Sequence, residues 1–185
     1  MSTIGHLFVG AAAARYTLSS PSRQRRLLFA TLIIALAIAP DLDLALFATL
    51  GVPESLTAGH RGATHSLFVA LVAAGFAALL ARALRVAWRP VAIGAFVAIG
   101  SHAVLDSLTP GPGVAWLWPF TDTRFPTFPV LPIATLEHPF SLEWIVRLVA
   151  ETVVFLPFLA YAVVGRRLRA GTSSASVSQH DRPPA

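Results

Sequence analysis

His102 and Asp106, in the stretch SHAVLDSLTP, are the pair of residues whose spacing most clearly suggests chemistry. Residues four apart lie on one face of a helix, so the imidazole and the carboxylate would point the same way from a rigid backbone. Both groups are common ligands of divalent ions such as Zn²⁺. The pair therefore predicts part of a metal site. The alternative is a histidine–aspartate hydrogen bond that only ties helices together.

Two further carboxylates follow a proline in the stretch IAPDLDLALF. Pro40 lacks a backbone donor and interrupts the helix just before Asp41 and Asp43. Such a break can direct both carboxylates into a cavity, and we expect both to be metal ligands. The same pattern also fits two aspartates that mark a loop between shorter apolar segments.

The stretch HRGATHS places His60 and His65 beside a long apolar run. Because residues five apart do not share a helix face, we expect one histidine from the loop and one from the helix start, where Thr64 or Ser66 would act as the cap. Both histidines are predicted metal ligands. A polar loop that enters a membrane helix is the alternative. Arg61 lies between them and suggests binding of an anionic substrate, with Ser66 as a second substrate-binding candidate.

Five weaker candidates lie outside these three motifs. His6 joins the predicted metal ligands only if the first apolar segment crosses the membrane. Arg147 and Glu151 are spaced to neutralise each other on one helix. Glu137 and His138 lie in a loop from which they could reach the site.

The composition indicates that these residues belong to a membrane protein. The chain is 55% hydrophobic and 12% charged, with a mean hydropathy of +0.68, and a soluble chain of 185 residues could not bury so much apolar surface. No cysteine is present, so histidine, aspartate and glutamate are the available metal ligands. The basic residues form short clusters, which favour membrane orientation over nucleic-acid binding.

Five apolar segments would position the candidate residues, and they predict an all-α, polytopic bundle of about five transmembrane helices. Four of them approach the ~20 residues of a spanning helix, namely residues 27–50, 66–84, 90–108 and 145–164. The fifth, residues 4–18, is shorter and would either cross or lie in the interface. It lacks the features of a removable signal peptide. Residues 1–168 form one expected domain, and residues 169–185 a disordered cytoplasmic tail.

The arginines predict the orientation of this bundle. Three clusters fall on one side if there are five crossings, and positively charged loops favour the cytoplasm. The clusters are Arg23, Arg25 and Arg26; Arg82, Arg85 and Arg89; and Arg166, Arg167 and Arg169. The loops 51–65 and 109–144 would then be exoplasmic, the second as a cap rich in proline and aromatic residues. The aspartates and histidines converge on that same side, which favours a single site.

Several short motifs occur in an order that resembles the YdjM-type family of LexA-regulated, inner-membrane-associated proteins. The motifs are GHLFVG, PDLD, HRGATHS, HAVLDSLTPGPG and WLWPF, between about residues 5 and 120. This resemblance implies a multi-pass helical protein of the inner membrane with metal-dependent hydrolase chemistry. A more distant likeness to zinc-dependent phospholipase C and related nucleases is analogy alone.

The residue types permit the chemistry that the resemblance implies. Imidazoles and carboxylates would hold one or more divalent ions, expected to be Zn²⁺, and activate water for hydrolysis. Asp43 is the first candidate for the general base, and Arg61 for stabilising a phosphoryl group. Membrane lipids are expected partners, and a lipid-linked or amphipathic phosphoester is the expected substrate. An ion- or proton-coupled transporter and a purely structural protein are the alternative classes.

Overall fold

The computed structural model describes residues 3–17, 22–51, 59–130 and 140–177. These residues form helices joined by turns and loops. An isolated β-bridge between Val114 and Phe125 is the only strand-like pairing among them. The helices, in chain order, are α1 (Thr3–Tyr16), α2 (Arg23–Ile38), α3 (Leu42–Leu50), α4 (Leu67–Ala83), α5 (Trp88–Ser107) and α6 (Leu142–Val177). The expected all-α fold is confirmed for this part of the chain.

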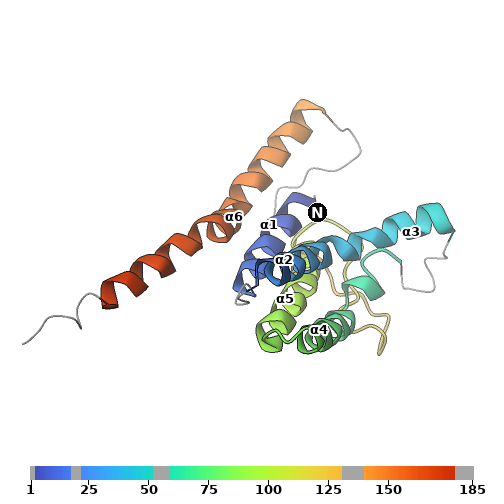
Figure 1. Ribbon diagram of the computed structural model, residues 1–185. Helices are drawn as coiled ribbons and strands as arrows, with labels where there is room; N and C mark the ends of the chain where they lie inside the picture. The colour runs from blue at the N-terminus through green and yellow to red at the C-terminus, as the bar shows by residue number, and fades with distance from the viewer. Residues whose placement is uncertain (1–2, 18–21, 52–58, 131–139, 178–185) are drawn as a thin grey trace, which may run out of the picture.

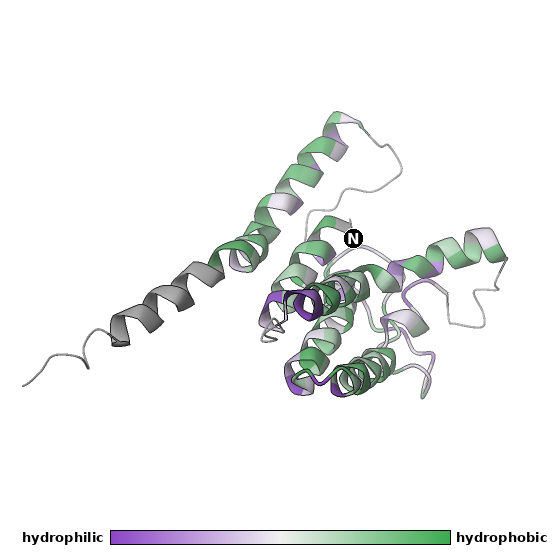
Figure 2. Ribbon diagram, in the orientation of Figure 1, coloured by the Kyte–Doolittle hydropathy of each residue, from purple (hydrophilic) through white to green (hydrophobic). Residues whose placement is uncertain are grey.

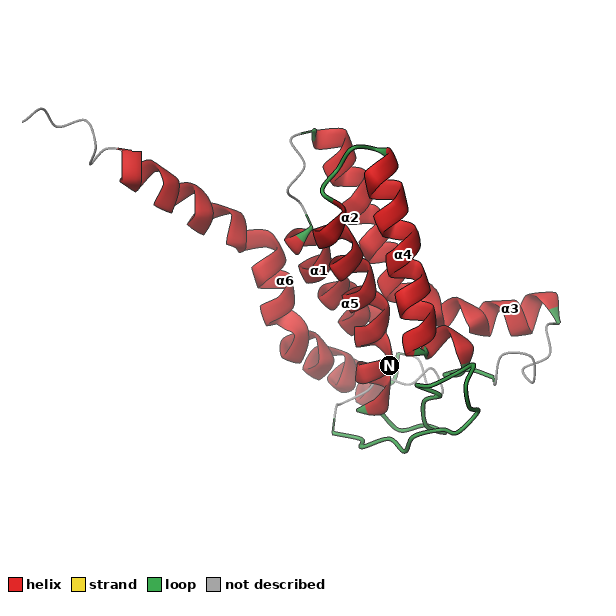
Figure 3. Cartoon of the chain, turned by 90° about the horizontal axis from the view of Figure 1, so that it is seen from below, coloured by secondary structure: helices red, strands yellow, loops and turns green. Residues whose placement is uncertain are grey.

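Five of these helices form a bundle, in which α5 is central. It packs against α1, α2 and α4, while α6 packs against α1 on the outside (Figure 1). Seen from the side, the loop 59–66 and the segment after α5 gather at one end of the bundle (Figure 3). The starts of α1, α4 and α6 and the ends of α2 and α5 therefore meet at that end, which we call the site end.

Three segments are long and apolar enough to cross a bilayer: Arg23–Phe47, Trp88–Ser107 and Leu142–Val164. The apolar helix α4 is shorter, and α1 rises only about 21 Å over its 14 residues. Both lie within the bundle, so α1 runs beside the longer helices. This arrangement matches the expected helical membrane bundle.

Small residues let the helices approach closely. The face of α4 toward the core consists of alanines, and a Cβ on Gly94 of α5 would clash with the Thr17 side chain. A Cβ on Gly10 of α1 would lie 2.6 Å from the Cβ of Ala37 in α2. Membrane helices associate through such small-residue contacts, because lipid tails are as apolar as leucine and provide no hydrophobic driving force. Large side chains such as Leu71 instead face outward.

Polar residues are concentrated at the two ends of the bundle (Figure 2). The arginines at the start of α2 lie at the end opposite the site, as do those between α4 and α5. At the site end, Arg61 and Arg124 lie in loops, and Arg147 lies near the start of α6. The separation of arginine clusters from the candidate site, expected from sequence, is present in the fold.

Pro40 divides the apolar segment 27–50 into two helices. A short 3-10 turn, Ala39–Asp41, ends α2 and starts α3. The interruption that Pro40 predicts is therefore confirmed, but residues 27–50 do not form one straight span. Instead, α3 extends sideways from the bundle, away from α6 (Figures 1 and 3). Its leucines are exposed, whereas Asp43 is 2% exposed and faces the site.

The segment after α5 covers the site end, as expected of the predicted cap. Its backbone is tied to the helices at several points: Ala115 N–H donates to Arg61 O, Leu67 N–H to Trp116 O, and Phe128 N–H to Ser107 O. At the other end of the chain, α6 continues to Val177, so residues 169–177 are helical where composition predicts a tail. Residues 178–185 lie outside the described part.

Candidate metal centre

The ring of His102 is fixed by the backbone of a neighbouring helix. It lies in α5, fully buried, with Nδ1 2.8 Å from the carbonyl oxygen of Ala37 in α2. A carbonyl oxygen only accepts, so Nδ1 carries a proton, and in the neutral tautomer the lone pair is then on Nε2. Nε2 lies 3.2 Å from Asp41 Oδ1.

His65 is oriented in the same way, by a relay through Thr64. The Thr64 hydroxyl lies 2.7 Å from Asp43 Oδ2, to which it donates, and 2.9 Å from His65 Nδ1. The hydroxyl oxygen can then accept the Nδ1 proton, which leaves the lone pair on Nε2. His65 Nε2 lies 3.2 Å from Asp106 Oδ2 and has no hydrogen-bond partner. Burial lowers the pKa of His65 despite opposing contributions from Asp106, which favours the neutral ring.

The third ring, His60, is held by Asp43. Its Nδ1 lies 2.9 Å from Asp43 Oδ1. Because a carboxylate accepts this hydrogen bond, Nδ1 carries a proton, and in the neutral tautomer the lone pair is on Nε2. A carboxylate behind the distal ring nitrogen is the usual arrangement for a metal-ligating histidine.

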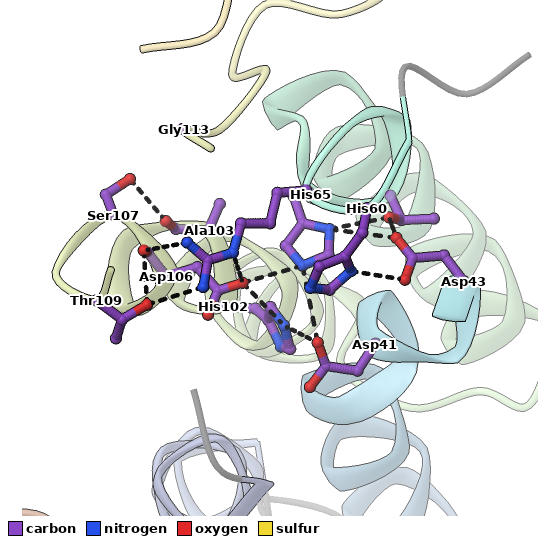
Figure 4. Close-up of polar contacts among 12 residues, drawn as sticks. Asp41, Asp43, His60, His65, His102, Ala103, Asp106, Ser107, Thr109 and Gly113 are labelled. Atoms are coloured by element: carbon purple, nitrogen blue, oxygen red, sulfur yellow. Dashed lines mark hydrogen bonds and ion pairs between the residues drawn. The ribbon is translucent and has the colours of Figure 1, made fainter. Parts of the chain in front are cut away.

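These rings and carboxylates converge at the site end (Figure 4). Asp41, His60, His65 and Asp106 each offer a ligand atom, and these atoms lie within 4.8 Å of one another. His6, Asp41 and His102 form a second such group. Asp41 belongs to both.

His6 reaches the site from α1, as expected if α1 runs through the bundle. Its ring stacks on His102, with centroids 3.6 Å apart, and its Nε2 lies 3.8 Å from Asp106 Oδ1. Neither ring nitrogen of His6 has a hydrogen-bond partner, although the side chain is 1% exposed. Such a buried imidazole without partners is costly unless an ion or water binds it.

Arg61 and Ser66, predicted to contact substrate, are largely occupied by protein groups. The Arg61 Nε lies 3.4 Å from Asp106 Oδ2, and its two terminal nitrogens donate to Asp106 O and to the Thr109 hydroxyl. A Cβ on Gly111 would clash with the guanidinium, so this position is closely packed against Arg61. Ser66 caps α4 by accepting from Val69 N–H, which confirms its expected capping role.

Asp43 also differs in position from the other candidate ligands. Its two oxygens contact His60 and Thr64, and it belongs to neither of the two ligand groups. Thr64 and the Ala37 carbonyl, which orient His65 and His102, were not identified as site residues from sequence. A threonine beside a histidine gives only a weak signal, and a backbone carbonyl gives none.

Two of the weaker candidates, Arg147 and Glu151, lie in α6. Arg147 pairs with Glu143 on the exposed face of α6. Glu151 is buried and accepts a hydrogen bond from Gly5 N–H, next to His6. Glu137 and His138 lie outside the described residues.

Water can reach this cluster from one edge. The side chains of Asp41 and His60 are 24% and 26% exposed, whereas His65, His102 and Asp106 are fully buried. Since α5 rises about 30 Å over its 20 residues, His102 and Asp106 lie about 21 and 27 Å from its start. The cluster is therefore close to one boundary of the hydrocarbon layer.

The fold and this cluster define a helical membrane protein with a buried group of aspartates and histidines able to bind metal ions. The chain belongs to the YdjM inner membrane protein family, which it matches over residues 1–172. It is also similar to the inner membrane protein YbcI of Escherichia coli (strain K12), with 41% identity over 102 residues. That match covers 54% of this chain and 57% of YbcI, so the chain spans a little over half of its relative's length. No solved structure matches the chain.

Proposed function

We propose that this inner membrane protein is a metal-dependent hydrolase that acts on phosphoesters of amphipathic substrates. The observation that carries the proposal is the direction of the histidine lone pairs. In His60, His65 and His102, Nδ1 lies against an acceptor, so Nε2 of each ring points at the cluster. Where Nε2 carries no proton, its lone pair and a carboxylate oxygen 3.2 Å away repel each other, and a metal ion between them would remove that repulsion.

The two ligand groups would hold up to two divalent ions that share Asp41. The larger group offers two imidazoles and two carboxylates, a ligand set that suits Zn²⁺. An ion bound there would lower the pKa of water toward neutrality and polarise a phosphoryl oxygen. Asp106 contacts His65 and lies near His6, so it would connect the two groups.

Asp43 and Arg61 would orient these ligands, and the second oxygen of Asp41 would accept the proton. We assign Asp43 to holding His60, because both of its oxygens are occupied. Asp41 is the more exposed carboxylate, and its contacts to His102 and His65 use Oδ1 alone. Its Oδ2 would therefore accept a proton from the attacking water. Arg61 would hold Asp106 and add positive charge beside the reacting phosphoryl group.

The location of the cluster supports the substrate class and the orientation. A phosphoester in a lipid head group lies at the depth of His102 and Asp106 and could meet the exposed edge at Asp41 and His60. The arginine-rich end would be cytoplasmic by the positive-inside rule, so the site would open on the periplasmic side. All the ligands lie at one end of the bundle, which suits hydrolysis better than alternating access.

Metal analysis of the purified protein tests the proposal. The alanine variants of His65, His102 and Asp106 should each lose most of the bound Zn²⁺ and all metal-dependent release of phosphate from a lipid phosphoester. His180→Ala, outside the described residues, is the matched control and should retain both. Far-UV circular dichroism and gel filtration in detergent would establish that each variant is folded. Equal metal content in all four folded variants would refute the proposed centre.

A further inference from the structure

An apolar groove lies between α2 and α4, on the membrane-facing surface of the bundle. Its cavity volume is about 280 Å³. The lining side chains are all apolar: Leu32, Leu36, Ala73, Phe76, Ala77 and Leu80. Phe76 and Leu80 are 70% and 41% exposed, so the groove is open to the side.

The two walls of the groove continue directly into the exposed edge of the candidate metal centre. From Leu36, α2 leads to Asp41 within about 7.5 Å, and Leu32 lies about one turn further away. In the other wall, Ala73 lies about 12 Å from His65, measured along the axis of α4. Asp41 thus follows the α2 wall and His65 precedes the α4 wall, so both walls lead toward the candidate metal centre.

The surroundings favour one kind of occupant. The groove is at hydrocarbon depth, where an all-apolar surface meets acyl chains. No polar side chain lines it, so it offers no hydrogen bond to a head group or a polar ligand. A lipid whose head group is near Asp41 and His60 would extend its chain about 7–20 Å deeper, which is the depth of the lining residues.

We infer that the α2–α4 groove binds one hydrocarbon chain of the substrate and so places the phosphoester of a long-chain lipid at the metal centre. This inference rests on the proposed function for the chemistry at the head group, but the groove itself binds the chain without metal. Binding of the hydrocarbon chain in the groove makes the protein selective for long-chain over short-chain phosphoesters. Binding of the chain would contribute affinity, and the cluster would contribute reactivity.

Native mass spectrometry of the detergent-purified protein tests the inference with dioleoyl phosphatidic acid and its dihexanoyl analogue. Wild type should retain one dioleoyl lipid and little of the short-chain analogue. Ala73→Phe fills the groove and should weaken retention of the long-chain lipid about tenfold, because an added ring overpacks the space. Ala35→Phe makes the same change on the exposed face of α2, outside the lining, and should leave retention unchanged. Leu36→Trp obstructs the groove from the opposite wall if Ala73→Phe does not fold.

The outcomes separate this inference from the proposed function. Zn²⁺ content should be the same in Ala73→Phe and wild type. Normal metal content with equal lipid retention in all variants would overturn the groove assignment and leave the metal centre standing. Lipid retention that depends on Ala73 in a protein without metal would support the groove and refute the hydrolase proposal. If filling the groove instead converts a dimer to a monomer, the occupant is a second copy of this chain and the inference is wrong.

Discussion

Replacing Asp43 by asparagine distinguishes a residue that orients a ligand from one that binds the metal. Asp43 accepts from His60 Nδ1 at 2.9 Å and from the Thr64 hydroxyl at 2.7 Å. In Asp43→Asn, the amide oxygen can still accept from His60, but the amide nitrogen would face Thr64. Thr64 would then have to accept instead of donate, and the relay to His65 would be broken.

The expected effect is partial because no ligand atom is removed. Loss of an outer carboxylate behind a metal-ligating histidine lowers metal affinity by about 10–100-fold, or about 1.4–2.8 kcal/mol. Asp41→Asn should have a larger effect, since Asp41 belongs to both ligand groups. Asp122→Asn, at an exposed loop position, is the matched control and should not change affinity.

A competition titration against a chromophoric zinc chelator, in detergent at constant pH and salt, measures these affinities. An Asp43→Asn protein with wild-type affinity would refute the orienting role. Complete loss of metal, equal to that of Asp41→Asn, would show that Asp43 is itself a ligand. If Asp43→Asn keeps its full metal content but hydrolyses much more slowly, the result would support the role of general base that the sequence predicts for Asp43.

Two further predictions concern α1 and the orientation of the bundle. His6→Ala should lower metal content as much as His102→Ala does, because the His6 ring stacks on His102 and neither of its nitrogens has a hydrogen-bond partner; a fully metallated and active variant would remove His6 from the site. Reporter fusions after Arg26 and Arg89 should indicate the cytoplasm, and a fusion near Gly113 the periplasm. The reverse pattern would place the metal centre on the cytoplasmic side.

The convergence of the site could be predicted from sequence because each part depended on a local rule. The four-residue spacing of His102 and Asp106 placed them on one helix face, and Pro40 marked the end of α2. The arginine clusters then indicated which end of each helix faces which side of the membrane. This predicted that His6, His65 and His102 lie at the same depth in the bilayer. The structure places these rings within a single cluster.

The orientation of the side chains depends on contacts that local spacing does not specify. The Ala37 carbonyl reaches His102 because α2 and α5 pack together, and no residue type marks such a contact. Arg61 has a left-handed backbone, with φ of 63°, and its side chain packs on Gly111. Hydropathy likewise could not show that the chain changes direction after Pro40, because α3 is as apolar as a spanning helix.

The ligands of the candidate centre are distributed over a hundred residues, from His6 to Asp106, and this has a consequence for biogenesis. At about 5–20 residues per second, a ribosome needs about 5–20 s to synthesise the chain between them. During that interval His6 and, once it has been synthesised, Asp41 are present in the growing chain without His102 and Asp106. Metal can therefore bind the complete centre only after α5 has been inserted. Glu151, which contacts the backbone beside His6, arrives later still with α6.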